Sequence, residues 1–174
     1  MLNHLLAQIK PYIQNPIKGL PKEVFEFVSS MTPMVNVDLV VIDDRKGVLL
    51  SWRDDEHCGE GWHVPGGIVR FKETREERIT KTALCEFGCE AAFDPSPFAV
   101  HEVIMPQEVR GHFICFVYRC YLPPDYEIPE NMRWDEKRPG ENAAGKLKWH
   151  SRNPEQWVRG QKPLYERFFE DLKL

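Results

Sequence analysis

The sequence predicts a mixed α/β (α+β) fold in which helices cover a mixed β-sheet. Three observations support this prediction: two apolar stretches meet at a tight turn, a glycine-rich loop leads into a helix, and a pair of alternating strands precedes the terminal helices. The 174 residues suffice for one hydrophobic core and are few for two. We therefore expect a single domain over 20–174, preceded by a helical extension over 1–19.

The N-terminal extension carries Leu2, Leu5, Leu6 and Ile9 at the spacing i, i+3, i+4 and i+7. Apolar side chains at this spacing share one face, so the segment predicts a short amphipathic helix. We expect this helix to pack on its own domain, with a partner protein or a membrane surface as the alternatives. A second short helix is predicted over 20–30, before the first strand.

The first two strands are indicated by apolar runs on either side of a turn sequence. Residues 34–42 are rich in valine, residues 43–47 read Asp-Asp-Arg-Lys-Gly, and residues 48–52 are again mostly apolar. This pattern is typical of two strands joined by a tight turn. A sheet is therefore expected to begin here.

A helix is predicted over 74–87, after the glycine-rich segment 59–67. We expect it to end at Gly88, because glycine favours the left-handed backbone of a helix C-terminus. The remaining predicted elements are strands over 98–105, 111–122 and 146–150, a long loop over 123–145, and helices over 155–160 and 164–172.

The composition restricts the partners and the compartment. A formal net charge of −4 offers no basic field that would attract nucleic acid. Five cysteines at irregular spacings do not form a disulfide framework, which favours a reducing compartment. The N-terminal segment lacks a signal peptide or an apolar run of membrane length. We expect a cytoplasmic protein with no nucleic-acid or membrane partner.

The segment that carries chemistry runs from a glycine pair at 66–67 to Glu86, near the end of the predicted helix. Glycines let a loop turn sharply and bring bare backbone carbonyls close to a metal, while a helix behind the loop presents carboxylates. Mg²⁺ held by one or two carboxylates, with waters and substrate phosphates, is usual for pyrophosphate substrates. The sequence therefore predicts one Mg²⁺, bound by Glu86 and the carbonyl of Gly67.

This segment resembles the signature of the Nudix hydrolases, G-x5-E-x7-R-E-U-x-E-E-x-G-U, where U is a bulky apolar residue. The positions that match in register are Gly67, Glu73, Glu86 and Gly88. Lys81 stands in place of the arginine, and Thr82 and Cys85 replace two of the glutamates. The resemblance implies the Nudix fold, an α/β/α sandwich with a mixed β-sheet.

The replaced glutamates make the motif most similar to that of the GDP-mannose mannosyl hydrolases, and this resemblance extends over 20–149. Further positions of that family's pattern are matched by Asp38, Arg53, Trp62 and His112. The resemblance implies that such residues bind a nucleoside diphosphate sugar and that water attacks the anomeric carbon of the sugar. It also implies a dependence on Mg²⁺ and a homodimer.

The general base of that family has no counterpart at its usual place. The family carries a Gln-His pair before its last strand, with the Gln on the metal and the His as base, and this sequence has Ala143 and Ala144 there. Base catalysis needs a proton acceptor within hydrogen-bond reach of the attacking water, which alanine does not supply. We expect Glu141 to serve instead, with Asp135 or Glu136 as alternatives.

These considerations define the predicted site. The expected catalytic residues are Glu141 and Arg53, the substrate-binding residues are Asp38, Arg53, His112 and Lys81, and the metal ligands are Glu86 and Gly67. We expect Glu73 to be structural and to pair with Lys81, since it lies at the helix start. Zinc is disfavoured, because His57, Cys58 and His63 are irregularly spaced and lack a fourth ligand.

Two rival functions remain open. A Nudix scaffold could bind a nucleotide or sugar without turnover, a reading that the absent Gln-His pair favours. An ordinary Nudix pyrophosphatase would cleave at phosphorus, although that chemistry usually uses more metal ligands than this helix supplies.

Overall fold

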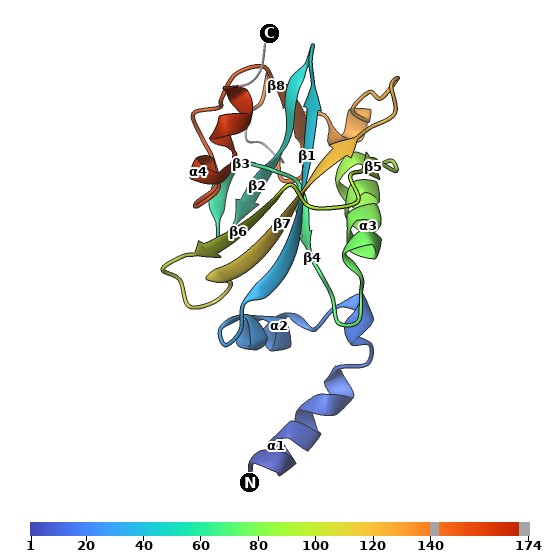
Figure 1. Ribbon diagram of the computed structural model, residues 1–174. Coiled ribbons are helices and arrows are strands. Elements are labelled where there is room, and N and C mark those ends of the chain that lie inside the picture. The colour runs from blue at the N-terminus through green and yellow to red at the C-terminus, as the bar shows by residue number, and fades with distance from the viewer. Residues whose placement is uncertain (140–142, 171–174) are drawn as a thin grey trace.

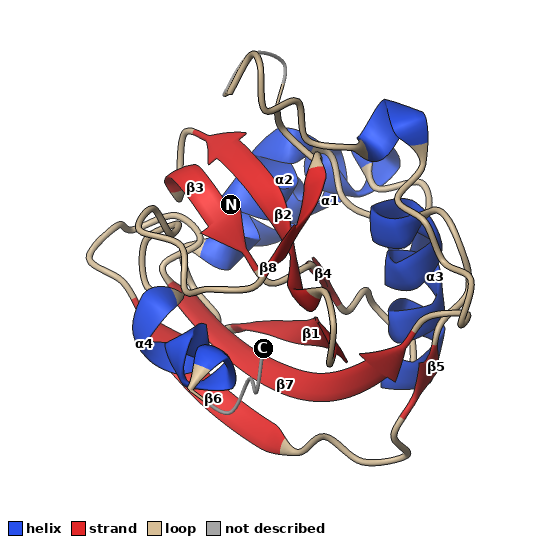
Figure 2. Cartoon of the chain, turned by 90° about the horizontal axis from the view of Figure 1, so that it is seen from above, coloured by secondary structure: helices blue, strands red, loops and turns tan. Residues whose placement is uncertain are grey.

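The computed structural model describes residues 1–139 and 143–170, in which one mixed sheet lies between helices (Figures 1 and 2). The strands are β1 (Met34–Asp43), β2 (Gly47–Asp55), β3 (Gly59–His63), β4 (Gly66–Ile68), β5 (Ala92–Phe93), β6 (Ala99–Ile104), β7 (His112–Tyr121) and β8 (Leu147–His150). The α-helices are α1 (Leu2–Ile9), α2 (Lys22–Ser29), α3 (Arg75–Phe87) and α4 (Lys162–Tyr165). Short 3₁₀ turns cover Lys10–Tyr12, Pro16–Lys18, Glu130–Met132 and Glu166–Phe169.

The sheet is mixed because β1 pairs in parallel with β7, whereas the other pairings are antiparallel. The central order is β3-β2-β1-β7-β5, with β4 on β1, β6 on β7 and β8 on β2. The run from Val37 to Val41 is buried at every position. A strand that is covered on both faces reads as a continuous apolar run, which explains the valines of this segment.

Two cores lie on the two faces of the sheet and confirm the predicted α/β/α sandwich. Val37, Leu39 and Val41 of β1 pack with α3 in one core, which we call the α3 core. Val40, which lies between Leu39 and Val41 in the strand, packs with Tyr165 of α4 in the other core, which we call the α4 core. Because successive strand side chains point to opposite faces, each residue of β1 belongs to one layer.

Helix α3 is defined by local signals at both ends. Thr74 caps its N-terminus by accepting from the Glu77 N–H, while the Glu77 carboxylate accepts from the Thr74 N–H in return. Gly88 ends the helix in the left-handed conformation with φ 73°. The predicted helix over 74–87 is therefore confirmed, and its position behind the glycine loop is fixed.

The prediction of a helix over 155–160 is wrong. Trp157 forms a bridge with Trp62 of β3, and residues 159–160 form a turn. The Trp62 N–H donates to the Gln156 carbonyl at 3.1 Å, and the Val158 N–H donates to the Trp62 carbonyl at 3.0 Å. The backbone groups that a helix would pair internally are therefore paired with a strand that lies far away in sequence.

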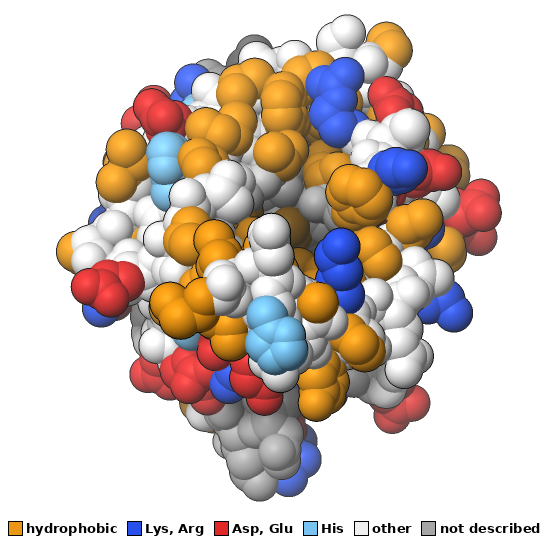
Figure 3. Space-filling view, turned by 90° about the horizontal axis from the view of Figure 1, so that it is seen from below, with side chains coloured by type: hydrophobic (Ala, Val, Ile, Leu, Met, Phe, Trp, Pro, Cys, Tyr) orange, Lys and Arg blue, Asp and Glu red, His pale blue; other side chains and the backbone are white. Residues whose placement is uncertain are grey.

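The N-terminal helix forms as predicted, but the expectation that it packs on its own domain is wrong. Leu2, Leu5, Leu6 and Ile9 are exposed by 68, 49, 47 and 39%, and no residue of α1 is buried. The helix projects from the body, and hydrophobic side chains gather on this end of the molecule (Figures 1 and 3). Within the described residues, no helix is long and apolar enough to cross a membrane.

We expect α1 to contribute little to the stability of the domain. Leu5→Ala should change the free energy of unfolding by less than about 0.5 kcal/mol, because its side chain is already in water. Leu39→Ala, at a fully buried position, should lower it by about 2–5 kcal/mol. Urea denaturation of both variants measures the difference, and an equal loss in the two would mean that α1 packs on the core.

Candidate functional site

A pocket of about 720 Å³ lies where β1, β2 and β4 meet the N-terminal segment and α4. It is lined by three of the residues that the sequence predicted for the site, Asp38, Arg53 and Gly67. Ligand pockets typically measure about 300–1,000 Å³, so the cavity has the size of a small-molecule site. Pro16 and Gly19 of the predicted extension also line it.

Asp38 is a buried carboxylate in the middle of β1, with 1% of its surface exposed. It accepts hydrogen bonds from the Tyr165 hydroxyl and the Asn36 amide. Burial raises the pKa of Asp38 to about 6, against the lowering effects of the hydrogen bonds from Tyr165, Cys115 and Asn36 and of the Arg53 charge. The side chain is thus held in place at the pocket wall, with a raised pKa.

Arg53, near the end of β2, connects the pocket with helix α3. Its guanidinium lies 3.4 Å from the Asp55 carboxylate and is about one third exposed. Burial raises the pKa of both Asp38 and Glu86, and the positive charge of Arg53 partly opposes the rise. Arg53 therefore interacts electrostatically with both carboxylates.

The glycine pair of β4 is required by close packing on both sides. A Cβ at Gly66 would lie 2.4 Å from Asp38 Oδ1, and a Cβ at Gly67 would lie 2.4 Å from Thr82 Oγ1. The backbone of β4 therefore runs between the Asp38 carboxylate and helix α3. No larger residue would allow this approach without moving one of its neighbours.

Glu86 lies one helical turn after Thr82, so it shares the helix face that contacts Gly67. Burial raises the pKa of the Glu86 carboxyl, and the charge of Arg53 partly opposes this rise. Glu86 makes no hydrogen bond or ion pair with any residue that the structure describes, and it does not line the pocket. A partly buried carboxylate with no donor suits a divalent cation, whose charge would compensate its burial.

Glu73 is structural, as expected. Its side chain is inaccessible and accepts from Lys81 Nζ at 2.8 Å, from Arg78 Nε at 2.7 Å and from the Arg70 N–H at 2.9 Å. Burial alone would raise the pKa of Glu73, but these hydrogen bonds lower it to about 2. The network fixes the loop between β4 and α3.

Two of the predicted substrate-binding residues lie away from the pocket. Lys81 is paired with Glu73 and does not line the cavity. His112 lies 3.2 Å from Glu102 and shares the face of β7 that carries Phe116, which packs in the α3 core. Asp38 belongs to the opposite face of the sheet, so the structure does not bring His112 and Asp38 together.

Of the three predicted general bases, the structure describes Asp135 and Glu136. Glu141 lies outside the described residues. Asp135 pairs with Arg138, and Glu136 pairs with Lys148. Neither of these two acids lines the cavity.

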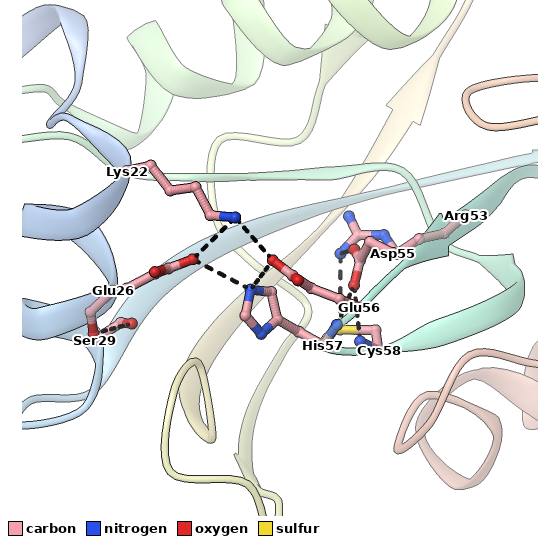
Figure 4. Close-up of polar contacts among 8 residues, drawn as sticks. All are labelled: Lys22, Glu26, Ser29, Arg53, Asp55, Glu56, His57 and Cys58. Atoms are coloured by element: carbon pink, nitrogen blue, oxygen red, sulfur yellow. Dashed lines mark hydrogen bonds and ion pairs between the residues drawn. The ribbon is translucent and has the colours of Figure 1, made fainter.

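Charged side chains join α2 to the turn between β2 and β3, as Figure 4 shows. Lys22 Nζ lies 3.0 Å from the Glu56 carboxylate and 3.5 Å from that of Glu26, and His57 Nε2 lies 3.5 Å from Glu56. Glu26, Glu56 and His57 could together ligate a cation, but the Lys22 ammonium already supplies positive charge there. Since Phe25 of α2 lines the pocket, the cluster holds one of its walls.

The three residues considered for zinc have separate partners. His57 faces Glu56, Cys58 Sγ lies 3.9 Å from Arg53, and His63 Nδ1 lies 2.8 Å from the Val64 carbonyl. Burial lowers the pKa of His63 to about 3, so this ring is neutral. The five cysteines are unpaired.

Sequence reasoning missed most of the positive charge in the pocket. Four further arginines line it, namely Arg70, Arg78, Arg110 and Arg159. They come from distant segments and follow no motif, so no local spacing marks them as one group. Only the folded chain reveals that they share a cavity.

The sheet order, the glycine turn and the helix behind it are those of the Nudix fold, and comparison with solved structures confirms the fold predicted from the motif. No profile of a known protein family matches the chain. A MutT Nudix hydrolase from Burkholderia pseudomallei superposes with a TM-score of 0.57 at 18% identity, over 81% of this chain and 98% of that one. A UDP-X diphosphatase gives a TM-score of 0.54 at 20% identity, over 97% of this chain and 75% of that one.

A characterised relative is also similar in sequence. The low-salt glycan biosynthesis protein Agl8 of Haloferax volcanii is 26% identical over 124 residues, which are 69% of this chain and 79% of the relative.

Replacing Glu73 should destabilise the fold in a pH-dependent way. At pH 7 we expect Glu73→Gln to lower the free energy of unfolding by about 3 kcal/mol, because two buried or half-buried cations lose their partner. The pKa of Glu73 falls from 4.5 to about 2 on folding. Its contribution is therefore fully present above the unfolded value and is lost as the pH falls towards the folded one.

Urea denaturation at pH 7 and pH 3 measures this dependence, and Glu90→Gln serves as an exposed control. The difference between wild type and Glu73→Gln should shrink at pH 3. A difference of the same size at both pH values would show that the charge of Glu73 is not the cause.

Proposed function

We propose that this protein hydrolyses a nucleoside diphosphate sugar in a Mg²⁺-dependent reaction, with water attacking the anomeric carbon of the sugar. The observation that carries the proposal is the partly buried Glu86 carboxylate on the helix face that contacts the glycine turn, which has no partner among the described residues and interacts electrostatically with Arg53. This arrangement suits a cation that meets a phosphate-bearing ligand. The pocket beside it has room for the remainder of such a ligand.

Different pocket residues bind different parts of the substrate. Arg53 binds the diphosphate, since its planar guanidinium suits paired phosphate oxygens. Asp38, held by Tyr165 and Asn36, accepts a hydrogen bond from a hydroxyl or an amide of the sugar or nucleoside. His112 and Lys81 stay predictions as substrate contacts, and a movement on binding would be needed to bring either of them to the pocket.

Glu86 and the Gly67 carbonyl would hold Mg²⁺, with water and phosphate oxygens as further ligands. When bound, Mg²⁺ stabilises the negative charge of the leaving diphosphate. One helix carboxylate favours a single ion over a cluster.

The names of similar proteins support this substrate class. One structural relative is a UDP-X diphosphatase, and the sequence relative takes part in glycan biosynthesis. A reducing cytoplasm suits the five unpaired cysteines. A homodimer is part of the proposal by resemblance to the GDP-mannose mannosyl hydrolases.

A nucleotide-binding module without turnover is the second candidate. Ala143 and Ala144 stand at the places of the family's metal-binding Gln and general-base His, and Ala143 is 4% exposed and packs in the α4 core. Alanine supplies neither a metal ligand nor a proton acceptor, so catalysis would depend on Glu141 or another acid of this loop. The third candidate function is that of an ordinary Nudix pyrophosphatase, which cleaves at phosphorus.

One labelling experiment separates the three functions. The protein is incubated with Mg²⁺ and a panel of nucleoside diphosphate sugars in ¹⁸O water, and the products are examined by mass spectrometry. Label in the free sugar supports the proposal, and label in the phosphate supports the conventional Nudix reaction. Saturable binding without turnover supports the binding module.

Glu86→Gln should remove the metal dependence. We expect kcat at saturating Mg²⁺ to fall by roughly 100-fold or more, because the neutral amide is a poor ligand for a hard cation. Glu90→Gln, which removes an exposed carboxylate just beyond the same helix, should retain the wild-type rate. Steady-state assays across a Mg²⁺ titration test both variants, and an unaltered Mg²⁺ dependence in Glu86→Gln would refute the metal site.

Glu141→Gln tests the general base. A lost base should lower kcat by about 10²–10⁴-fold with little change in substrate affinity. Glu155→Gln is the matched control on an exposed segment. An unchanged rate in Glu141→Gln would mean that another group accepts the proton.

A further inference from the structure

Arg110 lies in the loop between β6 and β7 and lines the same pocket as Arg53. None of the roles described above uses it. Its guanidinium lies 5.9 Å from the ring of Phe25, which belongs to the α2 wall of the pocket. Arg110 therefore occupies the pocket boundary between two segments that are far apart in sequence.

The guanidinium of Arg110 is incompletely satisfied. Its Nε is buried and has no hydrogen-bond partner among the residues that the structure describes. Leaving a buried charged donor unpaired is costly, so such groups are usually met by water or by a ligand. Arg78 Nη2 is likewise without a hydrogen bond, but it lies 2.6 Å from the Glu73 carboxylate, so the Arg78 charge is paired. Arg70 donates to the Lys18 carbonyl.

The backbone of Arg110 adopts an unusual conformation, with φ 56°. The left-handed region costs a residue with a side chain roughly 1–2 kcal/mol. The loop enforces it: a Cβ at Gly111 would lie 2.0 Å from the Gln107 carbonyl, and the Met105 N–H donates to the Gly111 carbonyl at 2.7 Å. A strained and tightly held arginine at a cavity is a pattern typical of functional sites.

Arg110 and Arg53 both act electrostatically on Asp55, and only Arg53 is paired with it. Both charges lower the pKa of Asp55, and the Arg53 guanidinium lies 3.4 Å from the Asp55 carboxylate. Within the described ranges, no ion pair joins Arg110 to a carboxylate. Two guanidinium groups around one carboxylate leave a surplus positive charge at the pocket, which would attract an anion of more than one charge.

The geometry points to Arg110 as a second anchor for the diphosphate group of the ligand, acting together with Arg53. The identity of the ligand rests on the proposed function, but the binding step requires no turnover. Arg110 would donate its unsatisfied Nε–H to a phosphate oxygen, and the strained loop would keep the side chain in position before the ligand arrives. The residue thus selects for the diphosphate and not for the base or sugar.

Arg110→Gly is the suitable test variant, because glycine adopts positive φ without strain and the fold should be retained or stabilised. The dissociation constants of GDP, UDP and the corresponding nucleosides are measured by titration calorimetry without added metal. We expect the diphosphates to bind about 10-fold more weakly or worse, and the nucleosides to bind as to the wild type. Arg110→Lys should give an intermediate loss.

Lys72→Gly is the matched control, since Lys72 has the same left-handed backbone, with φ 59°, but is exposed and outside the pocket. It should bind all ligands like the wild type. Equal affinities in wild type and Arg110→Gly would overturn the inference, as would an equal loss for diphosphates and nucleosides. If the wild type binds diphosphates through Arg110 but shows no turnover, only the proposed hydrolysis is refuted.

Discussion

The site depends on the pairing of β1 with its neighbours. β1 carries Asp38 and forms hydrogen-bonded ladders with β2, β4 and β7. Through these ladders it fixes Arg53 near the end of β2 and the glycine pair of β4. The glycines in turn set the distance between the sheet and α3, since Gly66 touches Asp38 and Gly67 touches Thr82. A shift of β1 by one residue would move Asp38 into the α3 core and dismantle every contact at the pocket.

Local chemistry made most of the fold predictable. The strands β1 and β2, the capped helix α3 and the antiparallel pair β6–β7 are encoded by periodicity, turn residues and caps that lie within each element. The segment 155–160 was mispredicted because its backbone pairs with Trp62, a partner that no local pattern reveals. For α1, the apolar spacing predicted the helix correctly, but an amphipathic pattern does not specify what covers its apolar face.

Where a motif ties residue type to spacing, the structure brings the predicted residues into one region: Gly67 packs on the face of α3 that carries Glu86. The role of these two residues as metal ligands stays a prediction, as does the role of Asp38, which the valine-rich context singled out. His112 shows the limit of this reasoning, because a match in register does not tell on which face of the sheet a side chain lies. Arg110 carries no motif at all, and its relevance arises from the tertiary contact that brings its loop to the pocket.

The wall of the pocket that α2 and the preceding turn provide has a practical consequence. Pro16 and Gly19 belong to this wall, and Lys22 ties it to Glu56 on the far side of the strand turn. A fragment trimmed to begin at Leu20 would retain the sheet, α2 and α3 yet lose the part of this wall that Pro16 and Gly19 form. Ligand selectivity measured on such a fragment would therefore be that of a more open cavity than the one in the longer chain.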